Sequence, residues 1–271
     1  MMLRPDTRPD SSRAIEQVAR DFGRSAAAYD VRWARYNLAT HLATLQRIDL
    51  NGHERVLDVG CGTGEFERHL MCRWPGLSLV GVDLCAGMLA RARSKFADRL
   101  PLEFVQASAE SLPFESGAFD IVVSCSAFHF IPDRRAALQE MARVLRPGGH
   151  LVLTDWSADF LTCRLLDWWL VLTNRAAHSG CLGTRECEQL LDSAGLRKLA
   201  MDTFRVGGFW GLMTVMARRP SAGKPHSGPQ FRTDCEERNH GSEAGGQAAS
   251  ARALQSPAEA VAARRLGHGR H

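Results

Sequence analysis

The sequence predicts an α/β fold built on a doubly wound, mostly parallel sheet. Short apolar runs typical of buried strands alternate with helical apolar spacing across residues 54–155, and this alternation implies parallel strands. The first run, 56–59, leads into a glycine-rich turn, and helical spacing begins near Glu65. The second run ends in Asp83. A strand, a glycine turn and a helix in this order place backbone N–H groups around a bound ligand.

The segment that precedes the sheet predicts two amphipathic helices. The first covers about 13–22, and the second covers about 31–48 with an apolar stripe that includes Leu38, Leu42 and Leu45. The segment GRSAAAYD at 23–30 is expected to break the helical structure between them.

The glycine turn reads VLDVGCGTG at 56–64. Its spacing, G-x-G-x-G, does not fit the G-x-G-x-x-G fingerprint of dinucleotide-binding folds. Asp83, at the end of the second strand, is nevertheless placed to bind the two hydroxyls of a ribose. A nicotinamide-dependent oxidoreductase therefore stays open as an alternative when the turn and Asp83 are considered alone.

The remaining elements follow in order along the chain. Further strands are expected at about 79–83, from Phe104, at 119–124 and at 150–155, with helices at about 86–96 and 133–145. An apolar helix follows at about 160–172, then a helix with Thr184 as its N-cap, and then strands at about 198–205 and 209–217.

Composition excludes several classes of protein. The net charge of +4 is not gathered in a basic arm, so no nucleic-acid partner is expected. No apolar run approaches the ~18 residues of a membrane span, although peripheral membrane contact by 160–172 stays open. The 8 cysteines form no C-x-x-C pair, and the first residues lack the apolar segment of a signal peptide. We therefore expect free thiols, no metal site and a cytoplasmic location, with no prediction of oligomeric state.

Four stretches resemble the class I S-adenosylmethionine (SAM) dependent methyltransferases. They are VLDVGCGTG (56–64), VGVD (80–83), ASAESLPFESGAFDIVVS (107–124) and VLRPGGHLVLTD (144–155), and they are most similar to the ubiquinone and menaquinone biosynthesis branch, the methyltransferase type 11 domain. The resemblance implies a Rossmann-like seven-stranded sheet with its last strand antiparallel, and SAM as the cofactor.

The same resemblance implies the domain organisation. A helical lid at 13–50 would cover a methyltransferase domain at 51–218. Residues 1–12 are expected to be disordered, and so is the tail at 219–271, which is rich in Gly, Ala, Ser and Pro and almost without large apolar residues.

The resemblance also assigns cofactor-binding residues in the first two motifs. The glycines at 60, 62 and 64 let the backbone contact the methionine part of SAM, and Thr63 matches a position that contacts the cofactor. Asp58 orders the turn or meets the amino group, and Asp83 holds both ribose hydroxyls. Cys61 and Leu84 complete this expected set.

The later motifs supply the rest of the site. Ser108 and Ala109 match positions beside the adenine ring, where many family members have aspartate in place of Ser108. Ser124 matches a position near the sulfonium. His129 is the candidate general base, although this chain has Phe130 where the branch often has a second histidine, and a lone histidine is more often structural.

The predicted function is transfer of a methyl group from SAM, by in-line displacement, to an apolar or aromatic small molecule. Aromatic residues in the expected lid elements, including Trp33, Trp168, Trp169 and Trp210, favour a quinone-like carbon or oxygen acceptor. Tyr29 and Trp33 are candidates to face the sulfonium, with core or lid packing as the alternative. The segment FGRSAAAYD at 22–30 also resembles malonyl-thioester O-methyltransferases, so a carboxyl acceptor stays open, as does a SAM-binding protein without catalytic activity.

Overall fold

The computed structural model describes residues 11–96, 102–172 and 179–221, all of which lie within one compact unit, Met1–Lys224. The disorder predicted at the two ends of the chain falls mostly on residues outside this description. Within it, Ser11 and Ser12 are helical.

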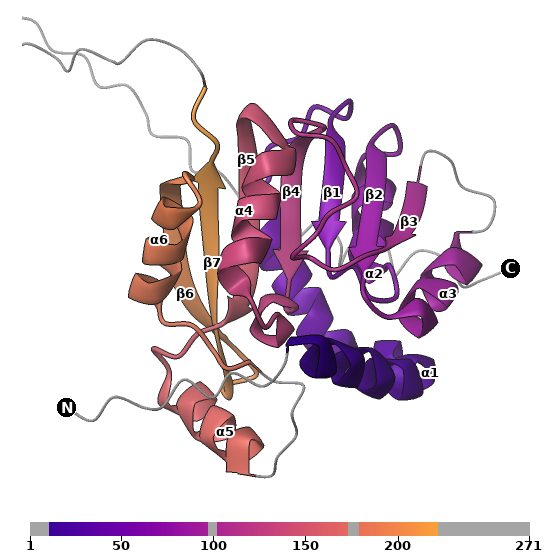
Figure 1. Ribbon diagram of the computed structural model, residues 1–271. Coiled ribbons are helices and arrows are strands. Elements are labelled where there is room, and N and C mark those ends of the chain that lie inside the picture. The colour runs from indigo at the N-terminus through magenta and orange to yellow at the C-terminus, as the bar shows by residue number, and fades with distance from the viewer. Residues whose placement is uncertain (1–10, 97–101, 173–178, 222–271) are drawn as a thin grey trace, which may run out of the picture. The chain divides into compact units, whose positions relative to one another are not determined.

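Seven strands form one mixed sheet in the order β3-β2-β1-β4-β5-β7-β6 (Figure 1). The strands from β1 to β5 pair in parallel, and β7 is antiparallel to both of its neighbours, β5 and β6. This arrangement confirms the predicted fold class. The bounds are β1 Arg55–Val59, β2 Ser78–Asp83, β3 Leu102–Gln106, β4 Phe119–Cys125, β5 Leu145–Trp156, β6 Arg197–Val206 and β7 Trp210–Arg218.

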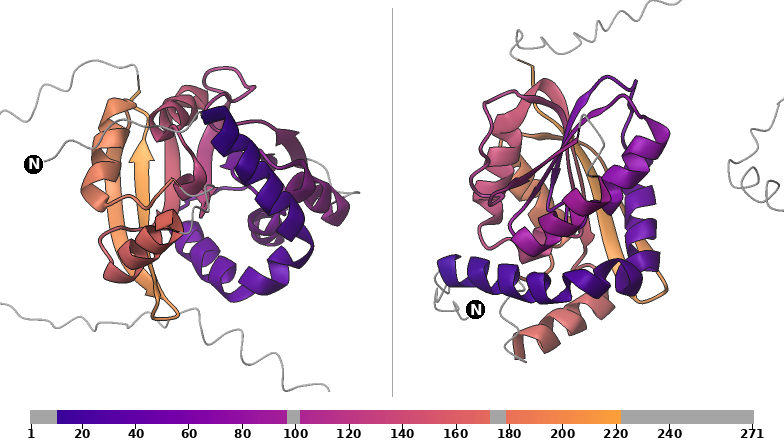
Figure 2. Two further views of the ribbon diagram at one scale, coloured as in Figure 1. Left: turned by 60° about the horizontal axis from the view of Figure 1, so that its bottom comes forward. Right: turned by 90° about the vertical axis from the view of Figure 1, so that its right-hand side faces the viewer.

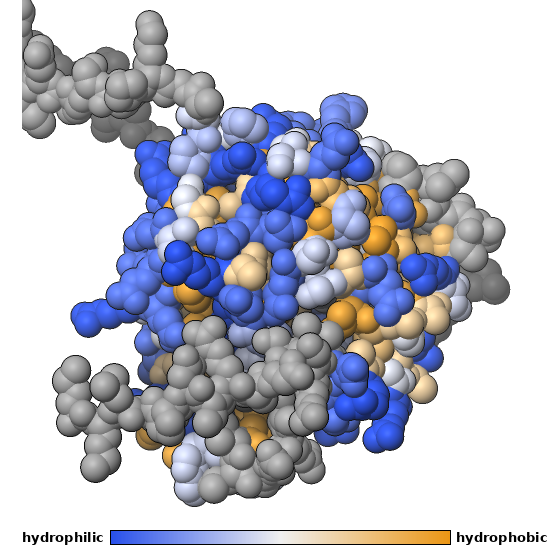
Figure 3. Space-filling view, viewed as in Figure 1, coloured by the Kyte–Doolittle hydropathy of each residue, from blue (hydrophilic) through white to orange (hydrophobic). Residues whose placement is uncertain are grey.

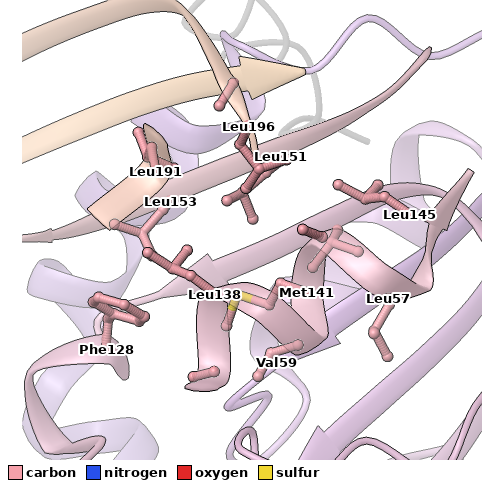
Figure 4. Packing of buried hydrophobic residues seen from close by; sticks show 14 of the residues in the cluster. Leu57, Val59, Phe128, Leu138, Met141, Leu145, Leu151, Leu153, Leu191 and Leu196 are labelled. Atoms are coloured by element: carbon pink, nitrogen blue, oxygen red, sulfur yellow. The ribbon is translucent and has the colours of Figure 1, made fainter. Parts of the chain in front are cut away.

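Helices cover both faces of the sheet. Helices α4 (Arg134–Val144) and α6 (Thr184–Ser193) contribute to one buried cluster, and α2 (Glu65–Arg73) and α3 (Ala86–Lys95) contribute to a second cluster on the other face. Figure 4 shows side chains of α4 lying among leucines of the strands in the first cluster. Because both faces are covered, the central strands are buried along nearly their whole length.

Helix α1, Ser11–Leu45, is a single 35-residue element, so the predicted break at 23–30 is wrong. Gly23 does not end the helix. It lies against α3, where a Cβ on Gly87 would come within 3.2 Å of the Gly23 Cα. The glycines thus allow two helices to approach closely. Figure 2 shows that α1 changes direction along its length, and it contacts both α3 and β5.

The buried face of α1 differs from the prediction in part: Leu45 packs against the second buried cluster, as expected, but the other two residues of the predicted apolar stripe do not. Leu38 and Leu42 are about half exposed, at 46% and 50%. The side that faces the domain is polar instead, and Thr44 on this side lies 2.6 Å from the hydroxyl of Thr154 on β5. The buried polar residues of α1 are Asn37, Thr40, His41 and Thr44. A polar stripe is stable here because hydrogen bonds satisfy much of it.

Two element boundaries differ from expectation for local reasons. Strand β5 begins at Leu145 because the segment 146–149 forms an irregularity within the β4–β5 pairing. The N-cap of α6 is Gly183 rather than Thr184. Thr184 is already helical, and its backbone N–H donates to the carboxylate of Asp159 at 3.1 Å.

Helix α5, Leu161–Leu172, carries the apolar segment expected near 160–172. One of its sides is exposed and includes Leu161, Leu165 and Trp168, while Cys163 on another side is buried. In the described part of the chain, no helix combines the length and the apolar character needed to cross a membrane. The face of the molecule in Figure 3 is largely hydrophilic, with apolar side chains showing between the polar ones, which is ordinary for a protein surface.

Candidate functional site

Two cavities meet at the glycine turn that follows β1. The larger, about 830 Å³ including its open mouth, lies at the carboxyl ends of the parallel strands, beneath Val18, Phe22 and Tyr29 of α1. The smaller, about 350 Å³, is lined by polar residues of α1 and of the turn. Four residues line both cavities: Tyr29, Gly60, Gly62 and Cys125. The two spaces are therefore suited to the two ends of one elongated ligand.

Two glycines give the turn its shape and its access. Gly60 has a φ of +84°, and a Cβ at this position would lie 2.3 Å from the Cβ of Ala127. Gly62 has a φ of +57°, and a Cβ there would meet nothing within 4 Å. Only glycine fits the first position, whereas the second leaves backbone open to the cavities that it lines. A ligand can therefore approach the main chain closely at Gly62.

Asp83 lines the larger cavity at the end of β2. Its Oδ2 accepts a hydrogen bond from the Gly62 backbone N–H, and its Oδ1 accepts one from the Cys85 N–H, both at 2.8 Å. Burial raises the pKa of Asp83, and these backbone hydrogen bonds oppose the rise. An ionised carboxylate has about four acceptor positions, so both oxygens can accept further hydrogen bonds from a ligand.

Asp58 lines the smaller cavity and interacts with a second buried acid, Glu67 of α2. Burial raises the pKa of both carboxyl groups. Repulsion from Asp83 adds to the rise for Asp58, whose pKa reaches about 8, and repulsion from Asp58 adds to the rise for Glu67. The Oδ1 of Asp58 has no hydrogen-bond partner among the residues that the structure describes, so it can accept a hydrogen bond from a ligand in this cavity.

The turn is joined to two helices by a polar network. Thr63, in the turn, donates its hydroxyl hydrogen to Asp30 of α1. Lys95, at the end of α3, lies 2.7 Å from Asp30 and 2.7 Å from Glu65 at the start of α2. Thr63 itself lines the smaller cavity. This network holds α1 over the turn, and sequence reasoning missed the part that Asp30 and Lys95 play in it.

Three more predicted residues lie in the larger cavity. Leu84, Ser108 and Ala109 all line it. The hydroxyl of Ser108 accepts a hydrogen bond from the Glu110 N–H at 3.2 Å, so this side chain also orders its own loop. Cys61 and the remaining turn residue Gly64 lie close by: Cys61 lines the smaller cavity, and Gly64 precedes α2.

Two predicted residues lie away from both cavity walls. Ser124 is fully buried and donates to the backbone carbonyl of Val59 at 2.8 Å, which ties β4 to β1. His129 is 3% exposed and stacks on Trp156 with ring centroids 4.1 Å apart. Its Nδ1 lies 2.5 Å from Asp155 Oδ1. The charge and hydrogen bonds of His129 lower the pKa of Asp155 although burial opposes this. A role for either residue in the reaction stays a prediction.

Ser126 is a cavity residue that sequence reasoning missed. It lines the larger cavity and has a φ of +55°, in the left-handed region that non-glycine residues seldom adopt. The Trp156 indole N–H donates to the Tyr36 hydroxyl, which lies 2.7 Å from the Ser126 Oγ. Either hydroxyl can be the donor in the contact between Tyr36 and Ser126. Because Ser126 also lines the cavity, its hydroxyl can form a further hydrogen bond with a ligand there.

The expected lid aromatics divide into two groups. Trp33 and Trp210 pack with Tyr36, with ring centroids 5.5–5.9 Å apart. Trp168 on α5 is 64% exposed. Of the aromatic residues considered for the sulfonium, Tyr29 lines both cavities, whereas Trp33 belongs to this packed cluster.

Known proteins match the part of the chain that forms the cavities. A family model described as a methyltransferase domain matches residues 57–153. A demethylmenaquinone methyltransferase of Thermus thermophilus is 39% identical over 131 residues, which cover 47% of this chain and 55% of that protein. This match thus spans about half the length of that relative. A malonyl-[acyl-carrier protein] O-methyltransferase of Enterobacter lignolyticus is 36% identical over 194 residues, 70% of this chain and 73% of that protein.

Solved structures show the same fold at low sequence identity. A putative methyltransferase from Bacillus halodurans has a TM-score of 0.59 at 21% identity, covering 68% of this chain and 100% of that one. A Haemonchus contortus phosphoethanolamine N-methyltransferase, solved with S-adenosylhomocysteine, has a TM-score of 0.66 at 17% identity, covering 77% and 60%.

Proposed function

Because this chain belongs to the class I SAM-dependent methyltransferases, we propose that it transfers the methyl group of SAM to an apolar or aromatic small molecule. A quinone-like ring carbon or oxygen is the favoured acceptor. The observation that carries the proposal is that one cavity combines the Asp83 carboxylate, which has spare acceptor positions, with the open backbone of Gly62 and an apolar wall.

The residues around the two cavities fit SAM. Asp83 would hold the ribose hydroxyls, because a carboxylate has about four acceptor positions and the backbone N–H groups around it do not occupy all of them. Leu84, Ser108 and Ala109 would lie beside adenine. The polar cavity at Asp58 would take the charged amino-acid end, for which a buried apolar site would be costly.

When bound, SAM supplies a methyl group on a positively charged sulfur that an acceptor nucleophile can displace in line. The protein itself would bind SAM and the acceptor and orient them toward each other. Val18, Phe22 and Tyr29 of α1 cover the larger cavity and limit access of water. Holding two reactants in a reactive geometry can supply roughly 7–11 kcal/mol of the barrier, so a shared set of catalytic side chains is not required.

The wall of the larger cavity supports a neutral acceptor. Its apolar part comes from two elements and consists of Val18, Phe22, Phe130, Ile131 and Pro132. The charged residues on the described lining are the acids Asp83 and Glu110, with no lysine or arginine among them. A carboxylate acceptor would lose water there without gaining a cation, which is unfavourable.

Methylation of a malonyl thioester carboxyl is the second candidate. It is supported by the 194-residue match to the Enterobacter lignolyticus protein and by the segment FGRSAAAYD at 22–30. The acidic lining of the larger cavity argues against it.

A competition assay with labelled SAM tests the proposal. The protein is incubated with methyl-labelled SAM and equal amounts of a short-chain demethylated naphthoquinol and malonyl-pantetheine, and products are identified by mass spectrometry. We expect label in the naphthoquinol. Label only in malonyl-pantetheine would establish the second candidate. SAM binding without a labelled product from these acceptors or from cell extract would contradict catalysis.

A further inference from the structure

The smaller cavity contains a buried histidine that no sequence motif identified. His41 of α1 lines the cavity together with Asn37, Asp58 and Thr63, and it is 7% exposed. Its Nδ1 has no hydrogen-bond partner among the residues that the structure describes. Buried polar atoms are nearly always paired, so a ligand that completes this hydrogen bond is expected in the cavity.

The imidazole of His41 is held in place and is neutral. Its ring centroid lies 5.3 Å from that of Phe66 and 5.4 Å from that of His69, both on α2. Burial, together with the nearby His69 and Arg68, lowers the pKa of His41 to about 3, although Glu65 opposes this. A neutral imidazole carries one N–H, so this side chain offers a single hydrogen-bond donor.

Two side chains of the smaller cavity are suited to ligand groups of opposite charge. Asp58 is suited to an ammonium, because its buried Oδ1 has no hydrogen-bond partner among the described residues and a nearby cation favours the ionised carboxylate. Asn37 is hydrogen-bonded to Tyr29. The described lining holds no lysine or arginine, so an anionic group must bind neutral donors, and His41 Nδ1 is the buried side-chain nitrogen of this lining that has no partner among the described residues. A ligand with its ribose at Asp83 would reach this cavity past Gly60 and Gly62, which line both spaces.

We propose that His41 binds the α-carboxylate of SAM through its Nδ1–H and so selects for the amino-acid end of the methyl donor. The inference rests on the proposed function, because it requires SAM to be the ligand. His41 is here a specificity residue for the donor, and it has no part in activating the acceptor.

Two substitutions separate the hydrogen bond from the shape of the ring. His41→Phe keeps an aromatic ring against Phe66 and removes the donor. His41→Asn loses the ring but places an amide N–H near the position of Nδ1. His53→Phe is the matched control, because His53 is exposed and lies outside both cavity linings.

Three ligands locate the contact when binding is measured by calorimetry. S-adenosylhomocysteine has both charged groups, decarboxylated SAM has the ammonium only, and 5′-methylthioadenosine has neither. We expect His41→Phe to raise the dissociation constant of S-adenosylhomocysteine about tenfold, as for loss of one hydrogen bond to a charged group. The dissociation constants of the other two ligands should change less than twofold. His41→Asn should recover part of the loss.

Other outcomes overturn the inference in distinguishable ways. Equal weakening of decarboxylated SAM and S-adenosylhomocysteine by His41→Phe would place the ring at the ammonium. Equal weakening of all three ligands would show a structural role. A parent protein that binds none of them would instead refute SAM as the ligand, and with it the proposed function.

Discussion

At the scale of single residues, Asp83 joins the architecture of the site to its chemistry. Its two oxygens accept the backbone N–H groups of Gly62 and Cys85, so the carboxylate ties the end of β2 to the glycine turn. The same carboxylate lines the larger cavity. A substitution here therefore changes both the shape of the turn and the acceptors that it offers to a ligand.

Replacing Asp83 with asparagine tests this double role. Asp83→Asn keeps the size of the side chain but replaces one acceptor oxygen with an N–H₂ group. This group is a donor and faces one of the two backbone N–H donors, so that hydrogen bond is lost. We expect the dissociation constant of SAM to rise about 100-fold and the free energy of unfolding to fall by about 1–3 kcal/mol. Calorimetry and urea denaturation measure the two effects. Glu103→Gln, at an exposed position of β3, is the control, and unchanged SAM affinity in Asp83→Asn would refute the assignment.

Residue-level prediction succeeded where one local pattern determines the role. Three glycines after a buried strand and an acid at the end of the next strand are visible in the sequence, and the structure places Gly62 and Asp83 at the larger cavity. Ser126 was missed because its backbone conformation and its contact with Tyr36 depend on packing between distant segments. His41 had a visible signal, since residues 37, 40, 41 and 44 form a polar stripe at helical spacing.

At the scale of elements, α1 is the part of the chain that completes the site. It supplies Val18, Phe22 and Tyr29 to the larger cavity and His41 to the smaller one. One polar network connects it to the turn through Asp30. We expect the position of α1 over the cavities to depend on this connection.

Asp30→Ala removes that connection. Thr63 loses its acceptor, and Lys95 keeps only Glu65. We expect faster amide hydrogen exchange in α1 and a three- to tenfold weaker affinity for S-adenosylhomocysteine, since the lost interactions are partly exposed. Asp21→Ala is a control in the same helix, because Asp21 accepts a hydrogen bond from Gln17 one turn away. Identical exchange in the two variants would show that Asp30 does not hold the helix.

Element boundaries were predictable where periodicity is strong and failed where tertiary contacts decide. The strands and the helices α2, α3 and α4 lie close to their predicted positions. The break at 23–30 was wrong because Gly23 serves close helix packing, and the apolar stripe at Leu38 and Leu42 was wrong because α1 faces a polar cavity. Neither the close packing at Gly23 nor the polar cavity beside α1 can be predicted from local helix propensity.

At the scale of the whole molecule, the buried acids make stability depend on pH. Folding raises the pKa of Glu67 above its ordinary 4.5, so above that pH the folded state binds more protons than the unfolded state. The free energy of unfolding therefore falls as pH rises through the interval above 4.5. His41 has the opposite effect. Its pKa is lower in the folded state, so below pH 6.5 the unfolded state binds more protons, and the free energy of unfolding falls as pH falls.

Comparing the parent with Glu67→Gln isolates this term. Glutamine is similar in size to glutamate and does not titrate, and all other ionisable groups are common to both proteins. We expect the parent to lose more stability than Glu67→Gln between about pH 5 and pH 8, by urea denaturation at each pH. Glu103→Gln should follow the parent. Parallel pH profiles for the parent and Glu67→Gln would show that Glu67 is ionised in the folded protein.

The position of β7 between β5 and β6 has a consequence for translation. Strand β5 is complete at Trp156, but the strand that pairs with its outer edge begins only at Trp210. Strand β6 is made before β7, yet among the described strands it pairs only with β7. A nascent chain that stalls between these points presents an unpaired strand edge, which another chain can extend. Ribosomal pausing before residue 210 therefore exposes this protein to aggregation that the finished sheet prevents.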